Sequence, residues 1–589
     1  MVNSNQVEVA TKERANEGKQ KRGHELMPRR GLAIMSGAGA LLLFLLTYLL
    51  SLDRVVGMFV DDAWYVLLAK ALATGQGYTL INSPSPGILP LYPPGFPWLL
   101  SLAYRLAPQF PQNVWLFKSI SIAAMLGVGI VSYRYFVRYR GLPHYVALGI
   151  AAATAVCPPQ VFFATTTVMA ECVFMFSQLL AIVVIERCVR VGRSGRAWHY
   201  ALLGAALASF AFLTRSIAFA LIVAAFVYLV KERLLLAALT FAVAVVLFVG
   251  PWMLYVRMHG PTAEQRMEQG GLIVEDYMTH FWRIQAGEPY SGTASVKDIS
   301  ARILRNTVRL ARSDVGAAFV APLIQFIKFR NVRAGEGFVF ILSILAVAGF
   351  LSVARERITL AEIVAPLSLI IIVAWPWLPQ RFVLPLSPFI IFYILIGLQV
   401  VHRFYQRSRQ ISNPRAPWVT AAIVVWCAVV INTLSNGKYI LSLHGPSAER
   451  PGRVRNFNEA EAMFGWIREN IPKEEVIASF NPALVHLYTG HKTIFPDHPT
   501  ENWGEWKRPG VRYLVFTPWH REPAFSRPGR NYRIVYQSRR NQNLKVIDLD
   551  AKGETSLVDD PRLPVALKQA ENRPQRSIKS ECFYTMRWK

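Results

Sequence analysis

Long apolar runs alternate with short polar segments through the first three quarters of the chain. Each run is close to the length of helix that crosses a bilayer, so the pattern predicts about eleven membrane-spanning helices. The predicted spans are residues 31–52, 114–137, 144–163, 167–186, 198–214, 216–230, 234–256, 337–353, 359–378, 383–401 and 418–434.

Lys and Arg residues gather in the segments that follow every second predicted span. The strongly basic loops follow residues 137, 186, 230, 353 and 401, so they all fall on one side of the membrane. Because positively charged loops stay in the cytoplasm, the N-terminal tail (residues 1–30) is predicted to be cytoplasmic and the C-terminus extracytoplasmic. A cleaved signal peptide is the alternative for residues 31–52, but the run is long and has no small-residue cleavage site. The chain is therefore predicted to be a multi-pass protein of the inner (plasma) membrane.

Two regions do not fit the pattern of spans. The segment 257–336 is too long for a simple connection, and its apolar part, residues 316–329, is short for a span. It is predicted to be a re-entrant or interfacial helix. Residues 435–589 are more polar and combine an amphipathic helix with short strand-like runs at 476–480, 511–517, 532–536 and 544–549. The fold class predicted is thus a polytopic α-helical membrane protein, with residues 31–434 in the membrane and 435–589 forming an extracytoplasmic α/β domain.

Composition supports a membrane protein over the other classes. Hydrophobic residues make up 53% of the chain and charged residues only 17%, although the formal net charge is +27. The positive charge lies in loops between apolar runs, so membrane topology and anionic membrane lipids explain it better than nucleic acid does. The five cysteines form no Cys-x-x-Cys pair and predict neither a disulfide framework nor a zinc site.

Two adjacent carboxylates, Asp61 and Asp62, follow the first predicted span. From Trp64 onward the apolar residues recur at helical spacing, which predicts a helix lying along the membrane surface with both acids at its start. The simple interpretation is helix capping, since Asp favours the first turn of a helix. The functional interpretation is an acid pair presented to a lipid-linked substrate.

The residues around this acid pair resemble the GT-C superfamily of membrane glycosyltransferases. The resemblance rests on Asp61-Asp62-Ala63-Trp64-Tyr65, Ala69-Lys70-Ala71-Leu72, Gly75-Gln76-Gly77-Tyr78, Tyr92-Pro93-Pro94-Gly95, Val168-Met169-Ala170-Glu171, Phe212-Leu213-Thr214-Arg215 and Gln380-Arg381-Phe382-Val383-Leu384-Pro385-Leu386-Ser387-Pro388. It covers about residues 1–434 and is nearest to the protein O-mannosyltransferase, aminoarabinose transferase and rhizobial galacturonosyltransferase branches. Two positions depart from the family: its acid pair is more often Asp-Glu, and Tyr92 stands where aminoarabinose transferases have Lys.

The resemblance implies transfer of a sugar from a polyprenyl-phosphate donor to an envelope acceptor, which could be a lipid, a glycan or a protein. It implies inversion at the sugar, with Asp61 as the general base and Asp62 as a second catalytic carboxylate. Arg381 and Arg215 would bind the donor phosphate together with Tyr92, although either arginine could instead be a snorkelling residue at the end of a span. Glu171 would contact the acceptor or a metal, or would only complement a helix dipole.

Other candidates are weaker. Lys118 is predicted to be an ordinary boundary residue, and His486 and His491 are compatible with a metal but are more often surface residues. The sequence leaves open whether the protein requires a divalent cation. The chain has no Walker loop and no Gly-x-Gly-x-x-Gly after a strand, which disfavours ATP or a soluble nucleotide sugar. The rival functions are a transporter or lipid flippase, and a non-catalytic membrane scaffold.

Overall fold

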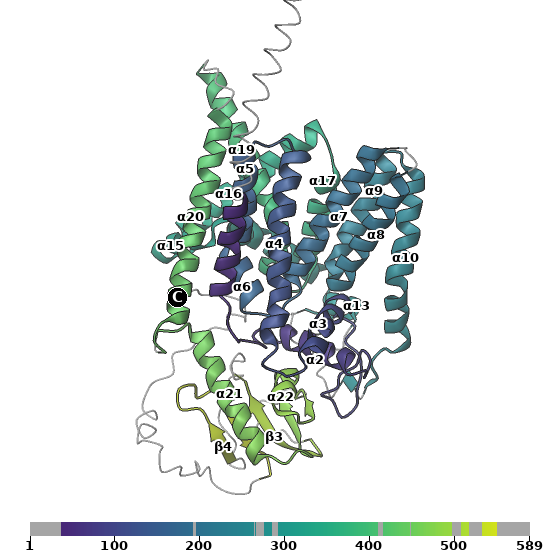
Figure 1. Ribbon diagram of the computed structural model, residues 1–589, viewed down its shortest axis with the longest axis vertical. Helices are drawn as coiled ribbons and strands as arrows, with labels where there is room; N and C mark the ends of the chain where they lie inside the picture. The colour runs from purple at the N-terminus through teal and green to yellow at the C-terminus, as the bar shows by residue number, and fades with distance from the viewer. Residues whose placement is uncertain are drawn as a thin grey trace, which may run out of the picture.

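In the computed structural model, a bundle of long helices carries a small α/β domain at one end (Figure 1). The structure describes residues 37–192, 196–263, 265–266, 276–284, 292–409, 416–447, 449–496, 508–517 and 533–550. The predicted cytoplasmic tail, residues 1–30, lies outside the described residues. We call the end of the bundle that meets the α/β domain the domain end, and the opposite end the far end.

Within these described ranges, eight helices are long and apolar enough to cross a membrane, or nine if one bent pair counts as a single span. They are α4 (Val114–Arg138), α7 (Glu171–Val191), α8 (Ala197–Thr214), α10 (Leu235–Met258), α16 (Val332–Glu356), α20 (Ala416–His444) and the composite helices Val296–Arg330 and Gln380–Ser408. Three shorter apolar helices, Gly37–Leu50, Ser216–Lys231 and Leu360–Ala374, coincide with further predicted spans. The prediction of a polytopic helical membrane protein is confirmed, and the count of eleven spans stays a prediction.

Several of these helices are assembled from shorter pieces. The bent pair consists of α5 (His144–Ala155) and α6 (Pro158–Thr165), which meet at 51° because Pro158 and Pro159 cannot continue the preceding helix. The other pieces are η1 (Ser216–Ala218) with α9 (Phe219–Lys231), α14 (Val296–Arg309) with η2 (Leu310–Asp314) and α15 (Val315–Arg330), α17 (Leu360–Ala374), and α18 (Gln380–Val383) with η3 (Leu384–Leu386) and α19 (Ser387–Ser408).

The outer surfaces of these helices are apolar. Leu247 on α10, Val347 on α16 and Leu434 on α20 are 67%, 58% and 69% exposed. Large apolar side chains that are exposed in such numbers along a helix bundle indicate contact with lipid rather than with water. The interior, in contrast, is packed with small residues such as the alanines of α8.

The composite helix Val296–Arg330 folds back on itself. Val320, two residues before Pro322, has non-helical dihedral angles (φ −144°, ψ 57°). Beyond this bend, the Lys328 Nζ atom donates a hydrogen bond to Ser313 Oγ at 3.0 Å. Fifteen residues of straight helix would separate these two residues by roughly 22 Å. By length and composition the segment could cross a membrane, but its path is that of a hairpin, the geometry expected of a re-entrant segment.

The basic helix ends meet at the far end of the bundle. Arg190 donates to the carbonyl oxygen of Arg138 at 3.1 Å, and Lys231 donates to that of Ile358 at 3.2 Å. Arg140 pairs with Glu362 at 2.9 Å. These contacts join the segments that follow α4, α7, α9 and α16, so four of the five basic segments predicted to share one side of the membrane lie together.

In its described residues, the C-terminal domain is a five-stranded mixed sheet with two helices. The elements are α21 (Gly452–Asn470), β1 (Val476–Ser479), α22 (Pro482–Thr489), β2 (Thr493–Ile494), β3 (Val511–Phe516), β4 (Arg533–Gln537) and β5 (Lys545–Asp548). The strand order is β2-β1-β3-β5-β4, with β1 parallel to both β2 and β3, and β5 antiparallel to both β3 and β4. The predicted α/β domain and its four strand-like runs are confirmed, while β2 was missed because it has only two residues. The membrane helix α20 continues past the predicted start of the domain at 435 to His444.

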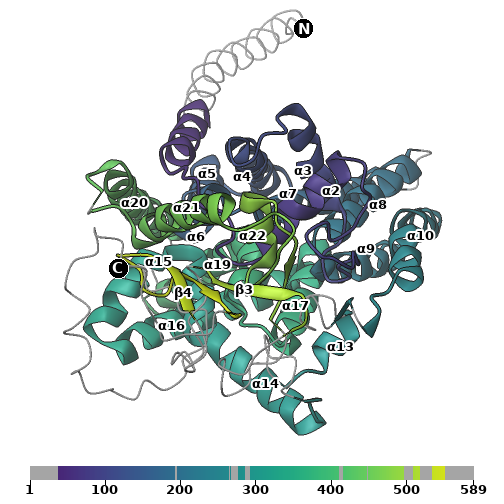
Figure 2. The same ribbon diagram turned by 90° about the horizontal axis from the view of Figure 1, so that it is seen from below.

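Two short helices lie between the bundle and this domain: α2 (Asp61–Ala73) and α3 (Gly95–Leu106) (Figures 1 and 2). The predicted helix after Trp64 is therefore present, but it is enclosed rather than lying open along a membrane surface, because every residue from Asp62 to Ala69 is buried. The C-terminal domain covers the side that was expected to be open. Asn481 donates to the carbonyl oxygen of Gly57 at 2.9 Å, and the backbone amide of Thr493 donates to that of Asn82 at 2.8 Å.

Candidate active site

Asp61 is the first residue of α2, and its carboxylate is 20% exposed. One carboxylate oxygen, Oδ1, accepts a hydrogen bond from the Tyr92 hydroxyl at 2.8 Å, and Oδ2 pairs with Arg381 Nη2 at 2.8 Å. Val60, the residue before it, has φ 66°, which is strained for a β-branched side chain. Such strain is often stored where a neighbouring side chain must be held in a particular direction. Asp61 thus meets a phenol and a guanidinium.

Asp62 has a different environment, because its carboxylate is completely buried. It accepts four backbone N–H groups, at distances of 2.8 to 3.3 Å, from Gly57, Met58, Phe59 and Ala63. Gly57 adopts φ 83°, the left-handed conformation that turns its amide toward Asp62. Burial raises the pKa of Asp62 to about 6, whereas the Gly57 amide acts in the opposite direction. The geometry favours a structural role for Asp62, which holds the loop before α2, and does not bring it into the group around Asp61.

A chain of ion pairs leads from Asp61 into the bundle. Arg381, from α18, has its Nε atom 3.8 Å from Glu171 Oε1. The same oxygen of Glu171, at the start of α7, is bonded to Arg215, which follows the end of α8. The side chains of Glu171, Arg215 and Arg381 are 3%, 13% and 17% exposed, so the chain runs from the protein interior to an accessible edge. Three of the predicted site residues are therefore brought together with Asp61.

Glu171 and Arg215 keep unused polar atoms. Among the described residues, Glu171 Oε2 and Arg215 Nε have no hydrogen-bond partner, although both atoms are buried. A buried polar atom without a partner is costly in a finished protein interior and is common where a ligand completes the site. Glu171 and Arg215 can therefore each form a further hydrogen bond, within the group of side chains that includes Asp61.

Tyr92 contacts Asp61, and its predicted contact with the donor phosphate stays a prediction. Burial and the Asp61 carboxylate raise the pKa of the Tyr92 phenol, so this group stays protonated and donates its hydrogen bond. The segment around it is fixed by two other tyrosines: Tyr78 donates to the carbonyl oxygen of Tyr92, and Tyr277 donates to that of Leu91 at 2.8 Å. These bonds set the position of the phenol that orients Asp61.

The Pro-Pro-Gly sequence after Tyr92 sets the approach of α3 to α8. A Cβ atom on Gly95 would lie 2.8 Å from the carbonyl oxygen of Leu213, so only glycine allows this contact. Leu213 lies two residues before Arg215, and the close approach therefore joins the Tyr92 segment to the arginine that pairs with Glu171. The glycine of the motif is explained by this backbone packing.

Sequence reasoning missed several aromatic residues of the site, among them Tyr65 and Trp377. Tyr65 lies one helical turn after Asp61, and its ring packs at 5.1 Å from that of Tyr92. Burial raises the pKa of its phenol, and Asp61 and Arg215 lie close enough to influence that pKa. The i, i+4 spacing from Asp61 was the available signal. Trp377 comes from the segment before α18, and nothing local in the sequence marked it.

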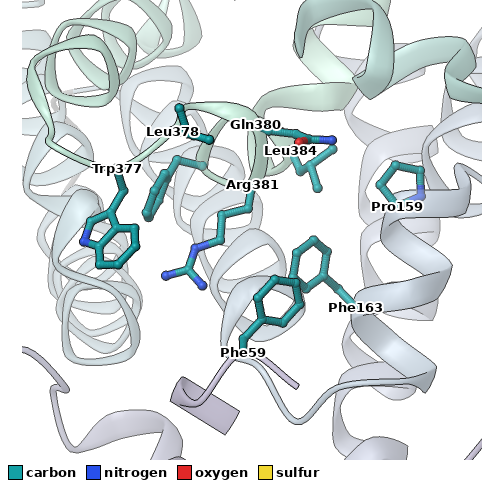
Figure 3. A pocket seen from close by; sticks show the side chains of 9 residues that line it. Phe59, Pro159, Phe163, Trp377, Leu378, Gln380, Arg381 and Leu384 are labelled. Carbon is teal, nitrogen blue, oxygen red and sulfur yellow. The ribbon is translucent and has the colours of Figure 1, made fainter. Parts of the chain in front are cut away.

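An aromatic cavity opens beside Arg381. Four aromatic residues, Phe59, Phe163, Trp377 and Phe382, are among those that line it, and the Arg381 guanidinium extends between Trp377 and Phe59 (Figure 3). The Phe59 ring stacks on Phe163 at 5.7 Å, which ties the loop before α2 to α6. The site thus combines an apolar cleft with a cation and a carboxylate at its edge.

The remaining candidates lie elsewhere. Lys118 was expected at a membrane boundary, but it is fully buried and pairs with Asp53 at 2.9 Å, so that interpretation was wrong. His486 and His491 each direct a ring nitrogen at a backbone carbonyl oxygen, of His491 and Ile471 respectively. In the described part of the chain, no three His, Cys, Asp or Glu side chains are grouped so as to hold a metal ion.

No family model and no curated protein sequence matches this chain. Several solved structures are similar to it. ArnT from Cupriavidus metallidurans in the apo state has a TM-score of 0.52 at 13% identity, over 88% of this chain and all of that one. ArnT from the same organism bound to undecaprenyl phosphate has a TM-score of 0.51 at 14% identity, covering 89% and 99% of the two chains. An oligosaccharyltransferase from Archaeoglobus fulgidus, in a complex with Zn and sulfate, has a TM-score of 0.48 at 13% identity, covering 80% and 67%. ArnT is a GT-C protein, and its similarity confirms that the present chain has the GT-C fold.

Proposed function

We propose that this GT-C-fold chain is a glycosyltransferase that uses a polyprenyl-phosphate sugar donor and Asp61 as its general base. The observation that carries the proposal is the Asp61–Arg381 pair, 2.8 Å long, at the edge of an aromatic cavity. A base for the acceptor and a cation for the leaving phosphate are the two groups that this reaction needs. ArnT bound to undecaprenyl phosphate shares the fold and supports the choice of donor class.

The cavity suits both the phosphate and the polyprenyl chain of the donor. The forked guanidinium of Arg381 matches the geometry of a phosphate. The rings of Phe59, Phe163 and Trp377 offer an apolar wall to the first units of a polyprenyl chain. Arg215 lies behind Arg381 and shares Glu171 with it, so it adds positive charge and fixes the guanidinium that would meet the phosphate.

The reaction is a single displacement at the anomeric carbon. Asp61 takes the proton of the acceptor hydroxyl, the hydroxyl oxygen forms the new bond to the anomeric carbon, and the bond from that carbon to the phosphate oxygen breaks. The electron pair leaves with the phosphate, where Arg381 and Arg215 stabilise the negative charge. One displacement inverts the sugar. An arriving phosphate competes with Asp61 for Arg381, which leaves Asp61 Oδ2 free to receive the proton, while Tyr92 keeps hold of Oδ1.

The possible divalent cation stays a prediction. Asp61 and Glu171 are both paired with arginines. No described group of three ligating side chains surrounds them. The proposed reaction uses only side chains of this chain.

The orientation follows from the basic loops. Positively charged loops remain in the cytoplasm, and the contacts of Arg190, Lys231 and Arg140 gather them at the far end. The far end and the N-terminus would then be cytoplasmic, and the domain end, with the site, extracytoplasmic. The enzyme would act in the inner (plasma) membrane on an envelope lipid, glycan or protein.

A transporter or lipid flippase is the second candidate, but the charges favour transfer chemistry. Transporters place their ionised groups near the middle of the bilayer. Here Asp61 begins α2, which lies at the junction with the C-terminal domain (Figure 1), and Arg381 and Glu171 are joined to Asp61 by ion pairs.

The test is turnover of defined donors by the full-length protein in nanodiscs. A panel of undecaprenyl-phosphate sugars is incubated with envelope extract, and release of free undecaprenyl phosphate is measured. We expect one donor to be consumed by the wild-type protein and not by Asp61→Asn. Asp276→Asn, which changes an exposed carboxylate that caps α13 (Tyr277–Phe281), should retain the activity. Movement of an intact donor across a liposome bilayer, with no donor cleaved, would establish the flippase instead.

A further inference from the structure

The short helix α13 contacts three segments that carry residues of the candidate active site. The Tyr277 hydroxyl donates to the carbonyl oxygen of Leu91, the residue before Tyr92, at 2.8 Å. It is also hydrogen-bonded to the side chain of Ser216, which follows Arg215. The third contact is made one turn later along α13, with the segment before α18. One turn of helix therefore reaches all three segments.

The position of α13 is fixed from its other side by Arg302 of α14. This guanidinium is 2% exposed and donates to the carbonyl oxygens of Phe281 and Arg283. It also donates to the carbonyl oxygen of Ala374, at the end of α17, at 3.3 Å. Carbonyl groups at the end of a helix have no partner within that helix, so Arg302 satisfies groups from two helix ends at once. Figure 2 shows α13 beside α14 and α17.

The contact with the segment before α18 is a hydrogen bond between two rings. The indole N–H of Trp377 donates to Nε2 of His280 at 2.7 Å, and His280 is only 2% exposed. The ring planes differ by 14° and the ring centres are 6.0 Å apart, so the rings meet edge to edge in nearly one plane. Because an indole nitrogen can only donate, the imidazole accepts at Nε2 and carries its proton on Nδ1. The bond fixes the rotation of the indole.

The orientation of Trp377 matters for the cavity beside Arg381. Trp377 lines that cavity, whereas His280 is not among its lining residues. Figure 3 shows the indole nitrogen on the side turned away from the Arg381 guanidinium. The bond to His280 thus satisfies the polar atom of the indole outside the cavity, and the ring presents carbon atoms to it. A buried N–H without a partner would be costly, so the bond also opposes other rotations of the ring.

We propose that His280 is a positioning residue for the lipid part of the donor, acting through Trp377. It holds the indole as an apolar wall for the prenyl units next to the phosphate. This inference rests on the proposed function, in which the polyprenyl chain of the donor enters this cavity. His280 itself does not touch the donor, and it takes no part in the proton transfer at Asp61. Its loss should therefore weaken donor binding and leave the chemical step unchanged.

The test combines donor kinetics with binding of undecaprenyl phosphate to the full-length protein in detergent, measured by native mass spectrometry. His280→Phe keeps a ring beside Trp377 and removes the acceptor. We expect the Kd for undecaprenyl phosphate and the donor KM to rise about three- to tenfold, the range for losing one hydrogen bond, with kcat unchanged. His280→Gln restores an acceptor and should recover most of the affinity. Met278→Leu, which changes a 66% exposed residue of α13, is the matched control and should bind as the wild type does.

A second variant keeps the test decisive if His280→Phe folds poorly. Trp377→Phe removes the N–H from the other side of the same hydrogen bond and keeps a ring in the cavity wall. We expect a similar loss of affinity. In the protein that carries both changes the two losses should not add, because both remove one interaction.

Three results would overturn the proposal: unchanged affinity in both single variants, additive losses in the double variant, or a fall in kcat with unchanged affinity. Failure of the proposed function would be seen separately. A wild-type protein that binds undecaprenyl phosphate but cleaves no donor would overturn the transfer reaction, and the affinities of the variants would still decide the role of His280.

Discussion

Two clusters of arginine, carboxylate and tyrosine lie at opposite ends of the helical bundle. At the domain end, Asp61, Arg381, Glu171 and Arg215 form a chain whose first members are 20% and 17% exposed. At the far end, Arg140 and Glu362 form a pair whose side chains are only 7% and 0% exposed. The residue types are the same, so the environment decides what each cluster does.

The far-end cluster is fully partnered. Arg140 Nη2 donates to both Glu362 oxygens, at 2.9 and 3.1 Å, and its Nε donates to Tyr135. Glu362 also accepts from Tyr393 at 2.7 Å and from Thr359, with which it forms a capping box at the start of α17. No polar atom of Arg140, Glu362 or Tyr393 is among the buried, unpartnered atoms of the described residues. This cluster is a structural joint between α4, α17 and α19.

The domain-end cluster is left incomplete. Glu171 Oε2 and Arg215 Nε are buried without a partner among the described residues, and an aromatic cavity opens beside Arg381. A closed network rigidifies a fold, whereas an unfinished one next to a cavity leaves capacity for a ligand. Matched substitutions in the two clusters should therefore change different measurements.

Removing one carboxylate from each cluster should have the largest effect. Asp61→Asn removes the proposed base, so turnover should fall about 10²- to 10⁴-fold while the unfolding temperature stays unchanged. Glu362→Gln leaves the buried Arg140 charge without its partner and should lower the free energy of unfolding by about 3–5 kcal/mol, with turnover per folded molecule unchanged. Steady-state kinetics and thermal unfolding in one detergent measure both. The opposite assignment of effects would show that the far-end cluster carries the reaction.

Replacing arginine by lysine keeps the positive charge but removes the forked guanidinium, which can donate two parallel hydrogen bonds. Arg381→Lys should raise the donor KM and lower kcat/KM by about 10- to 100-fold, because bidentate phosphate binding is lost. Arg140→Lys should instead cost about 2 kcal/mol of stability, because the bonds from one guanidinium to Glu362, Thr359 and Tyr135 cannot all be replaced. Donor titrations and denaturation curves separate the two results. A loss of stability without a kinetic change in Arg381→Lys would make Arg381 a structural residue.

Removing one tyrosine hydroxyl from each cluster should have the smallest effect. Tyr92→Phe releases one oxygen of Asp61 and should lower turnover by roughly 3- to 10-fold, the consequence of losing one orienting hydrogen bond. Tyr393→Phe removes a bond to Glu362 and should lower the free energy of unfolding by about 1–2 kcal/mol. The measurements are those used for the carboxylates. Equal kinetic effects in both variants would contradict the assignment of the domain-end cluster to catalysis and of the far-end cluster to structure.

Part of the site was predictable from local sequence. Asp61, Glu171, Arg215 and Arg381 were picked out because each stands at the end of an apolar run or in a motif that resembles the GT-C superfamily, and the structure brings all four together. Their assignment to catalysis stays a prediction. The two acids could not be told apart from sequence, because only the fold shows that four backbone amides enclose Asp62 while Asp61 faces Arg381.

By itself, the sequence determined the membrane helices, the gathering of basic loops at one end and the strands of the α/β domain. Each depends on the polarity of neighbouring residues in the chain, which sets how a segment partitions between lipid and water or packs in a sheet. Only the tertiary structure decided that α2 is buried on all sides, that Lys118 is paired with Asp53 inside the protein, and that Trp377 faces Arg381. Those outcomes depend on side chains brought together from segments far apart in the sequence, and no local pattern records which segments will meet.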